Sequence, residues 1–176
     1  MKALIALLLL SVNPATAQEE VETRKTLGER KHEVKIGAIK LLAGVILEGT
    51  YEYIKNEDLT FGVSILGNLD TENDYPEDFA VTPFVRFYFQ ETKQYGANGF
   101  FVEGFGKYSV GKYNGDYMGV EEDYSAPAIG LALGKKWVNK TGFVFEILAG
   151  AGRTLGNTDS APEATFRGDF NIGYRF

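Results

Sequence analysis

The chain has 176 residues, a formal net charge of −6, no cysteine and one histidine. An acidic chain is a poor candidate for binding nucleic acid, which requires basic surfaces. The absence of cysteine excludes disulfides and thiolate chemistry, so stability must come from a core, from closure of a barrel or from a bilayer.

Residues 1–17 are typical of a secretory signal peptide. Lys2 supplies the positive start, residues 3–10 supply the apolar stretch, and residues 15–17 give a small-residue cleavage pattern. Since the apolar stretch is too short to span a bilayer as a helix, we predict export with cleavage before Gln18. Residues 18–31 are polar and of mixed charge, and we predict that they form a short flexible periplasmic tail.

The remaining residues, 32–176, alternate between polar and apolar side chains in segments that turn residues separate. Because side chains alternate across a strand, each segment predicts one strand. The predicted strands are 33–41, 45–55, 59–68, 79–89, 99–110, 125–138, 143–152 and 166–176. The facing of the first strand is ambiguous. The connection at 42–44 is unusually short, which indicates either a tight turn or an incorrectly bounded first strand.

Short and long connections alternate along this series, which is typical of outer-membrane barrels whose short turns are periplasmic. No apolar run after residue 17 is long enough for a membrane helix. The sequence therefore predicts an all-β fold, an eight-stranded antiparallel up-and-down transmembrane β-barrel preceded by a short polar tail.

The last predicted strand has an aromatic-rich face and a charged face, and the chain ends on Phe176. An aromatic last residue resembles the C-terminal signature by which bacterial outer-membrane proteins are recognised for insertion. The residues that we assign to this membrane-insertion signature are Phe170, Ile172, Tyr174 and Phe176.

In a membrane barrel the apolar side chains face lipid and the polar ones face the interior. The charged residues that we predict to face inward are Glu48, Glu52, Arg86, Glu103, Lys107, Lys136, Glu146, Arg167, Asp169 and Arg175. An eight-stranded barrel is just wide enough for side chains to fill it, so we expect an ion-pair network in which Glu52 meets Arg86. A conduit or a small-ligand site is the alternative.

The residues suggest no catalytic, cofactor or metal site. His32 lies at the start of the first strand, on the same rim as the termini, without a nearby serine to activate. Outer-membrane lipid A deacylases carry a His-x-Ser pair near the outer leaflet, and His32 is followed by Glu33 and Val34 instead. Acidic residues gather in two predicted loops, where we expect solvation, or at most weak binding of divalent cations. They are Asp70, Glu72, Asp74, Glu77 and Asp78 in one loop, and Glu121, Glu122 and Asp123 in the next.

Four segments carry a resemblance to known proteins: residues 51–53, 83–89, 99–104 and 130–134. Over about residues 35–176 the chain resembles a family of small outer-membrane β-barrels of unknown function, with an OmpX/OmpA-like architecture. The resemblance implies a fold and a location, and it implies no mechanism.

We expect a non-enzymatic outer-membrane protein with a structural or surface-interaction role. Its expected partners are outer-membrane lipid, lipopolysaccharide and, through the C-terminal strand, the barrel-assembly machinery. We expect a monomer without cofactors. The alternatives are a narrow channel for small solutes, a soluble periplasmic lipocalin-like binder of apolar ligands and, least favoured, an enzyme.

Overall fold

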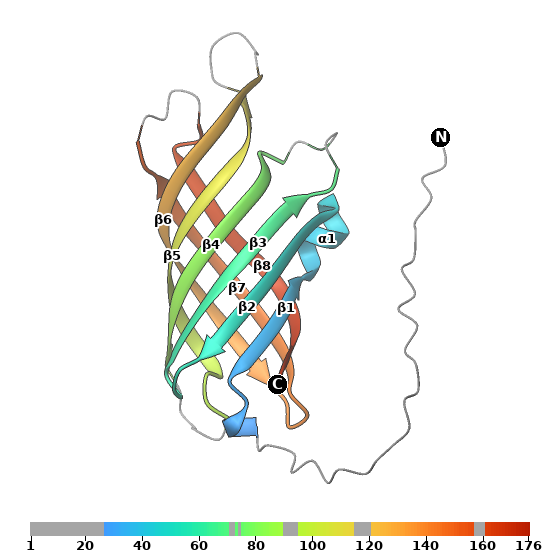
Figure 1. Cartoon of the computed structure of the whole chain (residues 1–176), viewed down its shortest axis with the longest axis vertical. Coiled ribbons are helices and arrows are strands. Elements are labelled where there is room, and N and C mark those ends of the chain that lie inside the picture. The colour runs from blue at the N-terminus through green and yellow to red at the C-terminus, as the bar shows by residue number, and fades with distance from the viewer. Residues whose placement is uncertain (1–26, 71–72, 74, 90–94, 115–120, 157–160) are drawn as a thin grey trace, which may run out of the picture.

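Eight antiparallel strands close into a barrel in the computed structural model, each paired with its neighbours in sequence and the first with the last (Figure 1). The structure describes residues 27–70, 73, 75–89, 95–114, 121–156 and 161–176. The predicted signal peptide and most of the predicted tail lie outside these residues. The strands are β1 (His32–Gly37), β2 (Ile46–Ile54), β3 (Leu59–Asn68), β4 (Glu77–Phe89), β5 (Gly99–Asn114), β6 (Glu121–Val138), β7 (Phe143–Thr154) and β8 (Ala164–Arg175).

The barrel has two different ends. The terminal rim, at the bottom of Figure 1, carries the start of β1, the end of β8 and the 3₁₀ turn η1 (Leu27–Glu29). The far rim, at the top, carries the helix α1 (Ala38–Gly44) and the ends of β3, β5 and β7. Strands β5 and β6 are the longest and rise above their neighbours on the far side.

The predicted first strand is wrong beyond residue 37, because the chain turns into α1 rather than continuing to residue 41. Of the two alternatives for 42–44, the tight turn is wrong and the incorrectly bounded first strand is right, since those residues belong to the helix. Strand β8 pairs with β1 only as far as Asn171, opposite Gly37, and α1 contacts both β2 and β8 beyond that point. The helix thus takes the place of a strand in the upper wall. No helix in the described part of the chain is long and apolar enough to cross a membrane.

The helix ends on a strained residue. Val45 follows α1 with φ of 55°, a left-handed conformation that a β-branched side chain rarely adopts. Its backbone N–H donates to the carbonyl of Lys40 and so closes the last turn. The strain lies at the junction where the chain reverses from α1 into β2.

Aromatic rings fill the interior where glycines leave room. Each of three inward phenylalanine rings lies over a glycine directly opposite in the neighbouring strand. The pairs are Phe84 with Gly62, Phe101 with Gly134, and Phe105 with Gly130. A Cβ atom at any of these glycines would overlap the ring, so the glycine is what allows the ring to lie flat against the wall.

Candidate functional site

The lumen is filled with charged side chains of both signs. Among the described residues, seven acidic and seven basic side chains point into it, so their formal charges balance. They are Glu33, Glu48, Glu52, Glu77, Glu103, Glu146 and Asp169, with Lys35, Lys40, Arg86, Lys107, Lys136, Arg167 and Arg175. Buried charges are tolerated only when they are paired and hydrogen-bonded, and the lumen meets that condition almost completely.

Arg86, on β4, is the centre of this network. Its guanidinium donates to Glu103 at 2.6 Å, to Glu52 at 2.7 Å and to Glu146 at 2.6 Å. The rings of Phe84 and Phe101 lie on it, with centroids 4.3 and 4.4 Å from its central carbon. Carboxylates from β2, β5 and β7 therefore meet one cation from β4, and the side chain is fully buried.

Two lysines complete the central layer. Lys35 on β1 donates to Glu52 at 2.5 Å and to Glu146 at 2.6 Å. Lys136 on β6 donates to Glu33 and to Glu52, each at 2.8 Å. Glu52 consequently accepts hydrogen bonds from three cations, and its side chain has no exposed surface.

At the terminal rim the network ends on Arg175. Its guanidinium pairs with Glu33 at 2.6 Å and donates to the carbonyls of Tyr95, Gly96 and Ala97. The penultimate residue of the chain thus holds the connection between β4 and β5 against the mouth of the barrel.

Toward the far rim the charged side chains form smaller groups than in the central layer. Arg167 on β8 pairs with Glu103 and, at 3.2 Å, with Glu48. Lys40, which α1 directs inward, pairs with the same Glu48, so the helix is fastened to the lumen by its one charged residue. Lys107 pairs with Glu77. Burial raises the pKa of Tyr75, in the connection before β4, so its hydroxyl remains protonated.

The structure places all the charged residues predicted to face inward in the lumen, and it joins all of them except Asp169 in ion pairs. Asp169 accepts instead from the backbone N–H groups of Ile39 and Phe170, at 2.9 and 2.7 Å. Asp169 thus caps the first turn of α1. It also accepts the backbone N–H of Phe170, at the point where β8 no longer has β1 as a partner. Its other carboxylate oxygen is buried without a hydrogen-bond partner.

Sequence reasoning misses several members of the network. It leaves out Glu33 and Lys35 because the facing of the first strand is ambiguous, and both are buried in the lumen. It assigns Glu77 to an acidic loop, but this residue begins β4 and pairs with Lys107. Of the other acidic residues predicted for that loop, Asp78 also belongs to β4, while Glu72 and Asp74 lie outside the described residues. The second predicted acidic loop is wrong too, because Glu121, Glu122 and Asp123 begin β6. The alternation of Glu33 and Lys35 against Val34 is the signal that could have found the first pair.

The residues assigned to the membrane-insertion signature lie on the outer side of β8. Ile172, Tyr174 and Phe176 are exposed, and Phe170 is half-buried. The backbone of Phe176 exchanges two hydrogen bonds with His32. The last residue therefore pairs with the first residue of β1 and helps to close the barrel.

His32 lies among aromatic rings at the terminal rim. Its Nδ1 is 2.7 Å from the hydroxyl of Tyr51, and its ring stacks on Phe176. No group of three or more potential ligands is arranged for a metal ion among the described residues. These contacts join β1, β2 and the last residue at the closure of the barrel.

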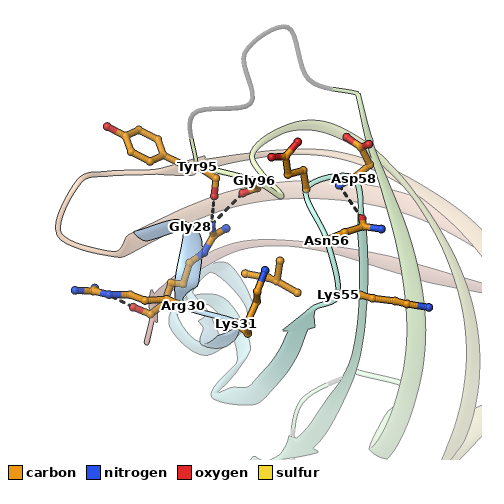
Figure 2. A pocket seen from close by; sticks show the side chains of 11 residues that line it. Gly28, Arg30, Lys31, Lys55, Asn56, Asp58, Tyr95 and Gly96 are labelled. Carbon is orange, nitrogen blue, oxygen red and sulfur yellow. Dashed lines mark hydrogen bonds between the residues drawn. The ribbon is translucent and has the colours of Figure 1, made fainter. Parts of the chain in front are cut away.

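A pocket of about 480 Å³ opens at the terminal rim (Figure 2). Tyr95 and Gly96 border it on one side and Asn56 and Asp58 on the other, with Lys31 between them. The side-chain oxygen of Asn56 accepts from the backbone N–H of Asp58 at 3.0 Å and so fixes the turn. The lining mixes basic and acidic groups and includes Arg175, which is paired with Glu33 in the ion-pair network. The pocket therefore lies at the terminal opening of the barrel, next to the ion-pair network.

The outer wall carries the opposite kind of side chain. Thirty large hydrophobic side chains are exposed among the residues that the structure describes, and they occur on every strand and on α1. The most exposed on the strands are Phe166, Leu131 and Leu133, with 75%, 66% and 65% of their surface accessible. This facing is the reverse of the one expected for a lipocalin-like binder, whose apolar side chains would line the interior.

The chain matches no protein-family model, no curated protein and no solved structure. A function must therefore be argued from the geometry of the barrel itself.

Proposed function

We propose that this protein is a bacterial outer-membrane β-barrel with a non-enzymatic, structural role, closed to solutes by the ion-pair network in its lumen. One observation carries the proposal: apolar side chains cover the outside of the barrel while balanced charges fill the inside. A membrane barrel needs this inversion because hydrocarbon surrounds it.

The apolar surface has the height that a bilayer requires. Strand β8 has 12 residues, and with about 3.3 Å per residue and a tilt of about 40° it rises roughly 30 Å. Its exposed apolar residues extend from Phe166 to Phe176. This length is comparable to the apolar band of about 25 Å on outer-membrane barrels.

Helix α1 extends the apolar outer surface beyond the end of the short strand β1. With six residues, β1 rises only about 15 Å by the same reckoning, which is too short to cross the hydrocarbon layer. Beyond it α1 exposes Ile39, Leu41 and Leu42. An uncovered sheet edge is not tolerated in hydrocarbon, so we propose that the helix covers the edges of β2 and β8 and continues the apolar surface.

Aromatic residues concentrate near the terminal rim, where Tyr53, Trp137, Phe143 and Tyr174 are exposed. Such belts lie at the level of the lipid headgroups. Together with the short turns on this rim, they support an orientation with the terminal rim in the periplasm. The far rim would then face the cell exterior, where a surface-interaction role is available to it.

Within the part of the chain that the structure describes, the lumen is narrow where α1 closes on β2 and β8. The cavity between Lys40, Glu48 and Arg167 measures about 10 Å³, the space of about one water molecule. The central layer beyond it is fully buried. This closure favours a structural role over a channel.

Two experiments test the proposal. Membranes from cells that produce the full chain are washed with urea and carbonate, and we expect release only with detergent; release without detergent would overturn the membrane location. The purified protein in planar bilayers should show no conductance steps. The double variant Arg86→Ser with Glu146→Ser, which empties the centre while keeping the charges balanced, should conduct. Steps from the unaltered protein would favour the channel.

A further inference from the structure

An apolar groove of about 440 Å³ runs along the outer wall from the end of β4 over β5, β6 and β7. Phe89, Phe100, Leu133 and Ile147 form its sides, and the small residue Ala149 leaves its floor open. The volume lies within the usual range of ligand sites. A flexible apolar chain is the kind of group that such a shallow, apolar groove can hold.

One cation lies at the end of this groove. Lys135 is on β6, directly opposite Phe100 on β5 and Ile147 on β7. Its ammonium group is 4.4 Å from the centroid of Phe100 and 5.2 Å from that of Trp137. The two rings cover part of the ammonium group. The side chain is half-buried and lines the groove, so the uncovered part of the ammonium group is available to a ligand there.

Lys135 is isolated on its part of the wall. Among the strand residues whose side chains the structure describes, Lys135 is the one charged residue that faces outward near the terminal rim. The others that face outward lie near the far rim: Asp78, Lys112, Asp123 and Arg153. A lysine placed one row inside Trp137 on an apolar wall has no carboxylate partner on that face among the residues that the structure describes. A membrane supplies phosphates at this depth.

We propose that Lys135 and the groove form a binding site for an anionic glycerophospholipid, with the phosphate at the ammonium group and one acyl chain along Leu133 and Ala149. The site rests on the proposed membrane location. The charge of Lys135 selects the headgroup and the apolar groove holds the chain, so each half can be altered separately.

The chain provides its own reporter, because Trp137 is its single tryptophan and lies beside Lys135. The full-length protein is reconstituted in vesicles of phosphatidylcholine with phosphatidylglycerol, and one lipid at a time carries brominated acyl chains that quench tryptophan fluorescence. We expect a preference of roughly fivefold for phosphatidylglycerol next to Trp137, the effect of one basic residue near an anionic lipid. Each variant is normalised to the same vesicles without bromine.

Lys135→Gln should remove this preference, and Lys140→Gln, in an exposed turn of the same rim, should retain it. Ala149→Phe fills the groove and should reduce the preference while Lys135 stays in place. Ala151→Phe, at the next outward position of β7, is the matched control. Equal quenching by both lipids in the unaltered protein, or a preference that survives Lys135→Gln, would overturn the site. Absence of quenching by either lipid would overturn the membrane location as well.

Discussion

Replacing Arg86 by methionine should destabilise the folded barrel more than almost any other single change. The side chain is fully buried and donates to Glu52, Glu103 and Glu146. Its removal would change the formal charge of the lumen from zero to −1 and leave three carboxylates competing for the remaining cations. Removing one partner of a buried ion pair typically costs 3–5 kcal/mol, and we expect about 4 kcal/mol here.

The double variant Arg86→Met with Glu146→Gln restores neutrality. Because the excess charge disappears, we expect it to recover at least about 2 kcal/mol of the loss, so the two changes should be strongly non-additive. Free energies of unfolding are measured by urea titration of the barrel folded in detergent micelles. Lys140→Gln, in an exposed turn, is the control and should change stability by less than about 0.5 kcal/mol. A cost below about 1 kcal/mol for Arg86→Met, or simple additivity in the double variant, would refute the network as the main electrostatic constraint.

Three further changes test individual parts of the fold. Val45→Gly should stabilise the barrel by about 1 kcal/mol in the same titration, because glycine removes the strain of the left-handed φ; a loss of stability would contradict this. Gly130→Ala should destabilise by about 1–3 kcal/mol, since its Cβ would lie 2.5 Å from the carbonyl oxygen of Ala151, whereas Gly49→Ala, which meets nothing within 4 Å, should be neutral. Equal effects of the two alanines would count against the close approach of β6 and β7 at Gly130. Deletion of Phe176 should lower the amount of folded, heat-modifiable barrel in the outer membrane, because the pairing with His32 is lost; unchanged assembly would remove the C-terminal strand from its expected role.

Alternation along the chain is sufficient to find most of the barrel. In β8, Arg167 and Asn171 face the lumen while Phe166 and Ile172 face outward, as the period of two predicts. The same pattern in β2 and β4 places Glu52 and Arg86 on inward positions of different strands. Their contact follows from the small diameter of an eight-stranded barrel.

The rest depends on contacts that alternation does not describe. Apart from Lys40, residues 38–44 are apolar on both sides of a strand pattern, so the helix could be recognised only from its place beside the edges of β2 and β8. Phe101 is an inward aromatic residue, and it fits there because Gly134 lies opposite. Asp169 has the same periodicity as its neighbours, but its role as the cap of α1 depends on that unpredicted helix.

Whether the outer wall meets hydrocarbon is measured most directly with a spin label at Leu131, which is 66% exposed in the middle of β6. Because the chain has no cysteine, a single Leu131→Cys change places the label without ambiguity, and Lys140→Cys serves as the aqueous reference. In reconstituted vesicles we predict frequent collisions with oxygen and few with a water-soluble nickel chelate at Leu131, with the reverse at Lys140. A label at Leu131 that the nickel chelate reaches as readily as at Lys140 would contradict the account.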